Sequence, residues 1–284
     1  MTSKQSLLKH TQYLLRKHNV KLRHRLGQHF LVNEDILRRQ VEYARLSSND
    51  AVLEIGAGTG NLTEFLVKNA KRVFVIEKDT GMIRILKERF SDAEDLEIIE
   101  GDALKLDFPR FDKAVANIPY VISSPLTFKL LEHTFDRAVL TYQREFAERL
   151  IAKPGTKNYS RLSVATYYRA RAEILEYIPR QAFYPVPKVA SAIVELVPRR
   201  KILEVNEGVF SRVLKGLFSH RRKSVANAAF HSYQFIFGRD VSKEERRRRI
   251  RELFPDELLK KRVYQLLPEE FAELADIVWN ATKR

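Results

Sequence analysis

The sequence predicts an α/β fold with a mostly parallel sheet, followed by a small all-α C-terminal domain. Short apolar runs rich in β-branched residues alternate with segments of helical periodicity, which is typical of parallel strands joined by helices. The character of the chain changes at Pro198-Arg199-Arg200-Lys201, and beyond it the apolar residues recur at helical spacing with few strand patterns. We therefore expect one domain over residues 1–200 and a second over residues 201–284.

At the N-terminus, residues 4–18 carry leucines among lysines and arginines, which predicts an amphipathic basic helix or arm. A basic run follows, in which Arg23 and Arg25 suit contacts with RNA phosphates; a solvated charged turn is the alternative. Asn33 then favours the start of a helix, because its side chain can cap the first turn.

Apolar runs with β-branched members predict seven strands, at residues 51–55, 72–76, 97–100, 113–116, 137–142, 173–178 and 192–197. Apolar residues at helical spacing predict helices at residues 61–70, 80–90, 123–132, 143–152 and from about 161. Because parallel strands end at the same edge of a sheet, the residues that follow the first four strands should lie close together.

The first strand runs into a glycine-rich turn, and Asp50 to Gly60 reads D-A-V-L-E-I-G-A-G-T-G. Gly56, Gly58 and Gly60 remove Cβ atoms where a ligand would approach the backbone. The dinucleotide pattern G-x-G-x-x-G would need its third glycine at Asn61, so NAD is disfavoured. The stretch resembles the first motif of the S-adenosylmethionine methyltransferases and indicates a Rossmann-like class I methyltransferase domain. A tight turn without a ligand is the alternative.

Two carboxylates follow the next two strands. Glu77 lies 21 residues past Gly56, where a ribose diol would present its hydroxyls; capping of the following helix is the alternative. Asp102, in the turn after the third strand, can accept a hydrogen bond from an exocyclic amine such as that of the cofactor's adenine, or it can satisfy the turn.

The fourth strand ends in the tetrapeptide Asn117-Ile118-Pro119-Tyr120. An exocyclic adenine amine is a poor nucleophile because its lone pair is delocalised into the ring. Two acceptors that hold its N–H groups can direct the lone pair along the S–CH3 bond without a general base. We expect the side-chain carbonyl of Asn117 and the backbone carbonyl of Ile118, held by Pro119, to be these acceptors, with Tyr120 stacked on the base.

The composition excludes several classes of protein. The chain has no cysteine, which excludes disulfides, thiolate zinc sites and a cysteine nucleophile, and the expected chemistry needs no metal. No apolar run approaches the roughly 20 residues of a membrane span, and the N-terminus lacks an apolar signal-peptide core, so we expect a cytoplasmic protein without membrane contact. The formal net charge of +15 favours a polyanionic partner.

Basic clusters in the C-terminal region predict an RNA-binding surface or, alternatively, solvated helix faces. The candidate RNA-binding residues there are Arg221, Arg222, Lys223, Arg246, Arg247 and Arg248.

Across nearly its full length the chain resembles the small-subunit ribosomal RNA adenine N6,N6-dimethyltransferases. The matching stretches are G-Q-H-F-L at 27–31, E-I-G-A-G-T-G at 54–60, Glu77, G-D at 101–102, N-I-P-Y at 117–120, F-Y-P-V-P-K-V-A-S at 183–191 and L-F-S-H-R-R-K at 217–223.

The resemblance implies roles for particular residues. The implied cofactor-binding residues are His29, Leu31, Gly56, Gly58, Glu77, Asp102 and Asn117. Gly56 would lie against the methionine portion, Glu77 would hold the ribose and Asp102 would read the adenine. Asn117 would bridge the cofactor and the target amine, and Phe183 and Tyr120 would sandwich the flipped base.

The resemblance also implies a function: addition of two methyls to each of two adjacent adenines in a 3′-terminal hairpin of small-subunit rRNA, during ribosome assembly. Bacterial relatives often carry asparagine where this chain has His29, which suggests an archaeal or eukaryotic-type member, and the short termini favour an archaeal one. We expect a monomer whose partner is small-subunit rRNA or an assembly intermediate of the small ribosomal subunit.

Two other functions are compatible with the motifs. One is an adenine or glutamine-amide N-methyltransferase acting on DNA or protein, which would use a similar N-x-P-Y loop; a protein substrate would not need the basic regions. The other is a ribosome-assembly or RNA-binding factor in which methyl transfer is secondary or lost.

Overall fold

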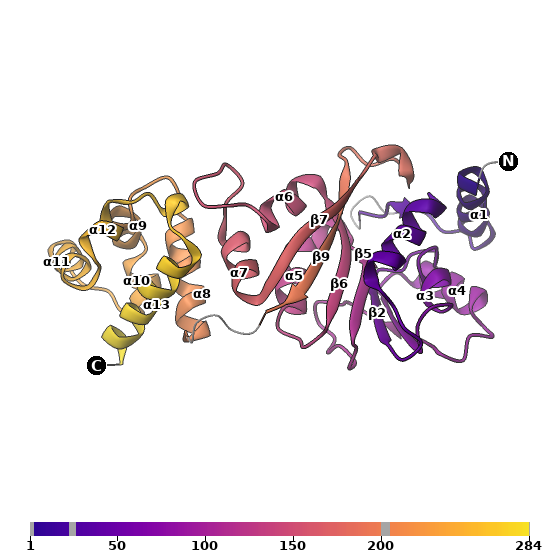
Figure 1. The fold of residues 1–284 in the computed structure, drawn as a ribbon, viewed down its shortest axis with the longest axis horizontal. Coiled ribbons are helices and arrows are strands. Elements are labelled where there is room, and N and C mark those ends of the chain that lie inside the picture. Colours follow the sequence, from indigo (N-terminus) through magenta and orange to yellow (C-terminus); the bar gives the residue numbers. More distant parts are fainter. Residues whose placement is uncertain (1–2, 23–26, 200–204, 284) are drawn as a thin grey trace. The chain divides into compact units, whose positions relative to one another are not determined.

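The computed structural model describes residues 3–22, 27–199 and 205–283. Their contacts divide the chain into two compact units (Figure 1). The sheet unit comprises the residues up to Ala147 together with Ala170–Pro198. The helical unit comprises Glu148–Arg169 together with the residues from Arg199 onward.

Seven strands form the sheet, in the spatial order β4-β3-β2-β5-β6-β9-β7. Their bounds are Ala51–Ile55 (β2), Arg72–Glu77 (β3), Leu96–Glu100 (β4), Lys113–Asn117 (β5), Arg137–Gln143 (β6), Ala170–Ile178 (β7) and Ser191–Pro198 (β9). Strands β2 to β6 pair in parallel, whereas β9 pairs antiparallel with both β6 and β7. The predicted mostly parallel α/β sheet is confirmed, and each predicted strand overlaps an observed one.

The helices of the sheet unit lie mostly between its strands in the sequence. They are α1 (Ser3–Lys17), α2 (Glu34–Ala44), α3 (Thr63–Leu66), α4 (Thr80–Arg89) and α5 (Ser123–Leu130), with the short 3-10 turns η2 (Tyr120–Ile122) and η3 (Arg180–Ala182); α6 (Arg144–Leu150) includes the boundary between the units. Asn33 caps α2 as predicted, because its side-chain oxygen accepts the N–H of Ile36 at 3.2 Å.

The helix predicted over residues 61–70 is wrong in length, because α3 has only four residues. The Asn61 side-chain amide donates to the Leu31 carbonyl and to the Thr11 hydroxyl, each at 3.0 Å. Gly60, just before it, has a left-handed φ of 81°. Because of these tertiary hydrogen bonds and this backbone conformation, the helix begins after Asn61. Neither effect can be recognised from the helical periodicity of the sequence.

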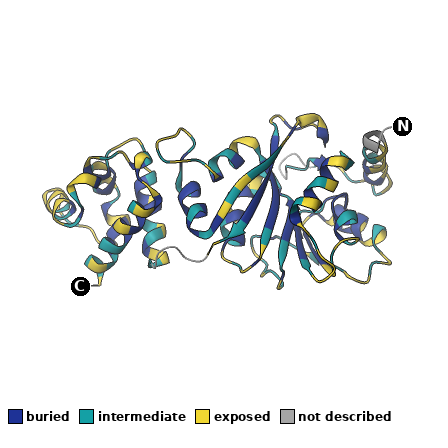
Figure 2. Cartoon of the chain, in the orientation of Figure 1, coloured by how far each residue is buried: buried dark blue, intermediate teal, exposed yellow. Residues whose placement is uncertain are grey.

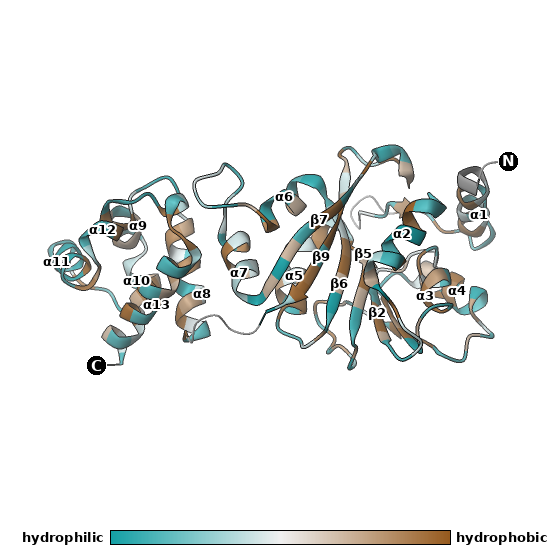
Figure 3. Cartoon of the chain, viewed as in Figure 1, coloured by the Kyte–Doolittle hydropathy of each residue, from teal (hydrophilic) through white to brown (hydrophobic). Residues whose placement is uncertain are grey.

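The central strands of the sheet are buried on both faces. In β2 every residue from Val52 to Ile55 is buried, and in β6 every residue from Ala138 to Tyr142 is buried (Figure 2). The same strands are predominantly hydrophobic (Figure 3), as expected for parallel strands covered on both sides. Polar side chains are therefore concentrated at the strand ends, where the candidate site lies.

A small two-stranded ladder joins two of the sequence motifs. Strand β1 (Phe30–Leu31) pairs antiparallel with β8 (Phe183–Tyr184), so that Phe30 lies opposite Tyr184 and Leu31 opposite Phe183. The G-Q-H-F-L segment and the F-Y-P-V-P-K segment, which lie about half the chain apart in sequence, are thereby held side by side.

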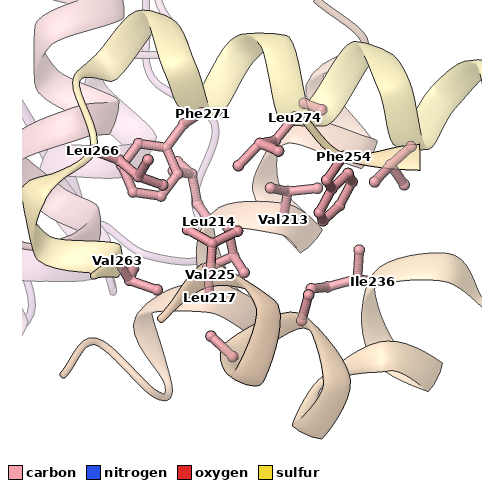
Figure 4. Packing of buried hydrophobic residues seen from close by; sticks show 14 of the residues in the cluster. Val213, Leu214, Leu217, Val225, Ile236, Phe254, Val263, Leu266, Phe271 and Leu274 are labelled. Atoms are coloured by element: carbon pink, nitrogen blue, oxygen red, sulfur yellow. The ribbon is translucent and has the colours of Figure 1, made fainter. Parts of the chain in front are cut away.

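The helical unit forms its own core, and the predicted helical C-terminal region is confirmed. Its helices are α7 (Arg161–Arg169), α8 (Glu207–Phe218), α9 (Val225–His231), α10 (Tyr233–Phe237), α11 (Lys243–Leu253), α12 (Asp256–Lys260), the 3-10 turn η4 (Val263–Gln265) and α13 (Pro268–Thr282). Side chains of α8 and α13, among them Leu217 and Phe271, meet in this core (Figure 4). No helix in the described part of the chain is long and apolar enough to cross a membrane.

The division into units differs from the contiguous division at residue 200 that the sequence suggests. Residues Glu148–Arg169 belong to the helical unit because their apolar side chains pack into its core. The Tyr159 hydroxyl donates to the Leu266 carbonyl at 2.9 Å, and the Tyr168 hydroxyl donates to the Pro268 carbonyl at 2.8 Å. Contacts between segments about 100 residues apart decide this membership, and local sequence patterns do not contain them.

Candidate active site

A cavity of about 380 Å³ opens at the carboxyl ends of the parallel strands. This position is where ligands bind in open α/β sheets, and the volume is in the range of small-molecule pockets. Ten of the predicted catalytic and cofactor-binding residues line it: His29, Gly56, Gly58, Glu77, Asp102, Asn117, Ile118, Pro119, Tyr120 and Phe183. The structure thus brings together nearly all of the residues that the sequence singled out for the sheet unit.

Leu31 is the exception among the predicted cofactor-binding residues. Its side chain is 2% exposed and packs in the core of the sheet unit. It lines a separate small cavity of about 30 Å³, beside Glu54 and Asn61, and not the main one. Contact between Leu31 and a cofactor stays a prediction.

The glycine-rich turn packs against the tetrapeptide that follows β5. Gly56 has a left-handed φ of 75°, and a Cβ on it would lie 2.9 Å from Cγ of Pro119. Gly60 does not line the cavity, and the space beside it is filled by the ring of Phe90 at 2.6 Å from a built Cβ. The glycines of this turn are therefore required for its backbone conformation and for close packing within the protein. Of the three, Gly56 and Gly58 line the cavity.

Glu77, at the end of β3, is buried and accepts three backbone N–H groups. Its Oε1 accepts from Lys78 at 2.8 Å and from Asp79 at 2.9 Å, and its Oε2 accepts from Gly58 at 3.0 Å. Burial raises the pKa of the Glu77 carboxyl, and the three N–H groups offset part of that rise. The alternative role of Glu77 as a helix cap does not apply, because Asp79 caps α4 by accepting the N–H groups of Gly81 and Met82.

Asp102 follows β4, the strand next to β3, and its carboxylate is also hydrogen-bonded. Its Oδ2 accepts from the Lys78 ammonium at 2.7 Å, and its Oδ1 accepts the N–H of Leu104 at 3.0 Å. The hydrogen bond from Lys78 lowers the pKa of the Asp102 carboxyl. Asp102 therefore satisfies the turn, and each of its oxygens can still accept one further hydrogen bond.

Asn117 is the last residue of β5, and it differs from Glu77 and Asp102 in the hydrogen bonding of its side-chain oxygen. Its Oδ1 is buried and has no hydrogen-bond partner among the described residues. The N–H of the next residue, Ile118, donates to the Thr141 carbonyl of β6 at 3.2 Å, while no described residue donates to the Ile118 carbonyl. Leaving a buried acceptor unpaired costs about 1 to 3 kcal/mol, and an unpaired amide oxygen at a cavity is available to accept a hydrogen bond from a ligand.

Tyr120 is held by two neighbours. Its hydroxyl shares a hydrogen bond of 2.6 Å with the Ser191 hydroxyl. The ring of His29 lies roughly parallel to its ring, with centroids 5.8 Å apart and an interplanar angle of 26°. His29 is itself tethered, because its Nδ1 donates to the Pro185 carbonyl at 2.7 Å. Burial raises the pKa of the Tyr120 hydroxyl, which keeps it protonated at neutral pH.

Sequence reasoning missed three residues in or beside the site. Lys78 lines the cavity, Ser191 bonds to the cavity residue Tyr120, and Glu54 lines the small neighbouring cavity. Glu54 is 2% exposed, accepts the Thr63 hydroxyl at 2.6 Å, and has its pKa raised to about 8 by burial. A signal was present for Glu54, because a carboxylate inside an otherwise apolar strand run is unusual. Lys78 directly follows Glu77, and Ser191 is the last residue of the F-Y-P-V-P-K-V-A-S motif. The sequence does not show that Lys78 bonds to Asp102 or that Ser191 bonds to Tyr120.

The predicted RNA-binding residues fall into two groups. Arg23 and Arg25 lie outside the described residues. In the helical unit Arg221 donates to the backbone carbonyls of Thr156 and Lys157, at 3.3 and 2.9 Å, which is a structural role.

The other predicted basic residues differ in whether another side chain in the helical unit pairs with them. Arg248 pairs with Glu245, Arg246 with Asp240, and the Lys223 ammonium donates to Nε2 of His231 at 3.0 Å. Arg222 and Arg247 are exposed, and no carboxylate in the described part of the chain pairs with either. The Arg247 guanidinium lies over the ring of Phe230, 5.3 Å from its centroid, which leaves its charge without a carboxylate partner among the described residues. Of the predicted residues, Arg222 and Arg247 are therefore the most available for a polyanion.

The described residues contain no group of three or more His, Asp or Glu side chains that could hold a metal ion.

The chain is similar to several known proteins. A family model described as ribosomal RNA adenine dimethylase matches residues 19–244. A probable ribosomal RNA small subunit methyltransferase A of Methanosarcina mazei is 44% identical over 272 residues, which is 95% of this chain and 98% of that protein.

Two solved structures resemble the whole fold. The crystal structure of a dimethyladenosine transferase from Plasmodium falciparum superimposes with a TM-score of 0.74 at 34% identity, covering 88% of this chain and 97% of that one. The 23S rRNA methyltransferase ErmE superimposes with a TM-score of 0.62 at 27% identity, covering 88% of this chain and 99% of that one.

Proposed function

Because this chain belongs to the ribosomal RNA adenine dimethylase family, we propose that it transfers methyl groups from S-adenosylmethionine to the N6 amines of two adjacent adenosines in a 3′-terminal hairpin of small-subunit rRNA. Each adenosine receives two methyls. The observation that carries the proposal is the buried, unpaired Oδ1 of Asn117 at the cavity. An acceptor of this kind is what an exocyclic amine requires if its lone pair is to be directed at a methyl donor.

The cofactor end of the cavity fits a nucleoside with an amino acid tail. Gly56 would lie against the methionine portion, because its turn brings the backbone to the cavity. A carboxylate has about four lone-pair sites, and three of those on Glu77 are taken by backbone N–H groups. The remaining site, on Oε2, can accept one ribose hydroxyl. Asp102 retains sites for the amine of the adenine.

The target end of the cavity supplies positioning and hydrogen-bond acceptors. The cofactor brings the electrophilic methyl, and its departure as a neutral thioether needs no assistance from a protein acid. Asn117 and the carbonyl of Ile118 hold the two N–H groups of the target amine, while Pro119 fixes the backbone between them. Tyr120 and Phe183 hold the extruded base between their rings, and base-aromatic stacking contributes about 1 to 3 kcal/mol per base. Most of the rate enhancement then comes from orientation.

The same acceptors serve the second transfer. The first transfer breaks the S–CH3 bond and leaves a cationic methylated amine, which releases one proton to solvent. The neutral amine then retains a single N–H, which either carbonyl can hold while the lone pair is directed at the methyl of a second cofactor molecule. Two acceptors therefore suffice for both steps, and no further protein group has to be recruited between them.

The RNA partner is supported by the charge of the chain. With a formal net charge of +15, the protein attracts a polyanion, and the exposed Arg222 and Arg247 lie on the helical unit. We propose that the helical unit and the N-terminal basic segment, including Arg23 and Arg25, contact the RNA backbone of small-subunit rRNA or a small-subunit assembly intermediate in the cytoplasm.

The direct test is nucleoside mass spectrometry after incubation of the purified protein with S-adenosylmethionine and small ribosomal subunits that lack the modification. We expect N6,N6-dimethyladenosine to appear, preceded by N6-monomethyladenosine. If the protein binds the cofactor but modifies neither mature subunits nor partly assembled particles, the proposal fails. Methylation of DNA or protein in parallel reactions would then support an amide or adenine N-methyltransferase of another substrate class, and binding to particles without any transfer would support an assembly factor.

A further inference from the structure

Ser191 closes the F-Y-P-V-P-K-V-A-S motif and begins strand β9, yet neither the predicted mechanism nor the predicted cofactor contacts use it. Its side chain is fully buried, with 0% exposure. Its backbone lies opposite Gln143 of β6 on one side and Ile178 of β7 on the other. Because β9 is paired on both edges, the sheet fixes the backbone position of Ser191.

This hydroxyl lies 2.6 Å from the hydroxyl of Tyr120, the aromatic residue of the Asn-Ile-Pro-Tyr segment. Tyr120 belongs to the short turn η2 and lines the cavity. The backbone anchors one end of the ring, and the bond to Ser191 anchors the other. A rotation of the ring about its first side-chain torsion would break that bond.

On this basis, and resting on the function proposed above, we propose that Ser191 is a positioning residue that fixes the ring of Tyr120 in the orientation needed to stack on the target adenine. Ser191 itself does not line the cavity, so it acts through Tyr120. The role differs from that of His29, which packs roughly parallel to the same ring and is held by the carbonyl of Pro185. His29 limits how far the ring can tilt, whereas Ser191 sets where its hydroxyl end lies.

The test compares Ser191→Ala, Tyr120→Phe and the double variant, each assayed for initial methyl incorporation into small ribosomal subunits and for binding of S-adenosylmethionine. A neutral hydrogen bond of this kind corresponds to roughly a 2- to 10-fold effect. We expect each single variant to raise KM for the subunits by about that factor, with cofactor Kd changed by less than about twofold. Because both substitutions remove the same bond, the double variant should be no worse than the more affected single variant.

Two further variants make the comparison specific. Ser191→Thr retains the hydroxyl, so its KM for the subunits should lie close to that of the wild type. Tyr142→Phe is the matched control, because the Tyr142 hydroxyl makes a comparable buried bond of 2.8 Å to the Thr127 hydroxyl but does not line the cavity. It should lower thermal stability while leaving KM for the subunits unchanged.

Several results would overturn the proposal. Multiplicative effects in the double variant would show that the two hydroxyls act independently. An unchanged KM in both single variants would show that the bond does not position the ring, and this can be read from Tyr120→Phe alone if Ser191→Ala does not fold. A loss of cofactor binding in Ser191→Ala would assign the residue to the other end of the cavity. If the wild-type protein itself formed no dimethyladenosine, the proposed function would fail, which is a distinct outcome.

Discussion

The two ends of the cavity differ in how their polar groups are engaged. At the cofactor end, Glu77 accepts three backbone N–H groups and Asp102 is paired with Lys78 and with a backbone N–H. At the target end, the Asn117 oxygen is buried and has no partner among the described residues. One end is organised before any ligand arrives, and the other keeps an acceptor open.

The difference follows from the cost of burying each type of group. An ionised carboxylate without partners is very costly to bury, so it must be hydrogen-bonded by the protein itself. A neutral amide carbonyl left unpaired costs only about 1 to 3 kcal/mol. In the proposed mechanism, the charged, pre-paired groups bind the cofactor and the neutral, unpaired group holds the reacting amine. Substitutions at the two ends should accordingly have different kinetic consequences.

The largest effect is expected from Asn117→Ala. Removing the acceptor should slow methyl transfer by about 10² to 10³, by analogy with the loss of one transition-state hydrogen-bonding group, while cofactor binding remains largely intact. Single-turnover transfer rates and calorimetric Kd values measure the two quantities separately. Asn69→Ala is the control, because within the described ranges that exposed side chain bonds only to the Phe65 carbonyl. A single-turnover rate like that of the wild type in Asn117→Ala would contradict the mechanism.

Glu77→Gln tests the opposite end. A glutamine side chain would turn an N–H group toward backbone donors, and the loss of a charged hydrogen-bonding site is worth about 1.5 to 3 kcal/mol. We expect the Kd for S-adenosylmethionine to rise by roughly 10- to 100-fold, with a transfer rate at saturating cofactor within a few-fold of the wild type. Glu97→Gln, which disrupts an exposed pair with Arg72, should change neither. If Glu77→Gln lowered only the transfer rate, the contrast between the two ends would be wrong.

Glu54 extends the comparison to a carboxyl that is buried with little pairing. Its pKa of about 8 in the folded protein lies above the roughly 4.3 of an unfolded glutamate, so the folded state binds more protons between these values. The stability of the wild type should therefore fall as pH rises through this window. Glu54→Gln lacks this titration. The difference between its free energy of unfolding and that of the wild type should therefore shift in favour of the variant by about 1.4 kcal/mol from pH 6 to pH 7.

Denaturant unfolding over a pH series measures this gap, provided that the variant retains the bond from Thr63. Glu94→Gln, at an exposed carboxyl, should follow the wild-type curve at every pH. A gap between Glu54→Gln and the wild type that did not vary with pH would show that Glu54 is ionised in the folded protein.

The smallest effect is expected in the helical unit, where the same contrast between engaged and open groups recurs. Neutralising Arg222 and Arg247 together should lower the slope of log affinity against log salt by up to about 0.9 for each lost duplex phosphate contact. Arg248→Gln, in a residue already paired with Glu245, should leave the slope nearly unchanged. Equal slopes for both variants would assign Arg222 and Arg247 to a solvated surface. Arg221 is unsuitable for this test, because it bonds to the backbone.

Much of the fold could be predicted from local patterns. The strand runs and the glycine turn read correctly because apolar periodicity and backbone conformation are local properties, and the parallel order then places Gly56, Glu77, Asp102 and Asn117 at one edge. The length of α3 differs from the predicted one, and the packing of Glu148–Arg169 with the helical unit has no local signal, since each depends on contacts with distant segments, such as those of Asn61 with Leu31.

The sequence by itself determined the fold class, the family and the residues that surround the cavity, because these follow from spacing and residue type. The tertiary structure alone decided which of those residues are already engaged. Glu77 and Asp102 each accept at least one backbone N–H group from residues one or two positions later in the chain, but the bond from Gly58 to Glu77 and that from Lys78 to Asp102 join different strand ends. Only the assembled sheet shows these bonds, the unpaired oxygen of Asn117 and the bond between Ser191 and Tyr120. Hydrogen bonds between distant segments have no local signature, so their pattern exists only in the folded chain.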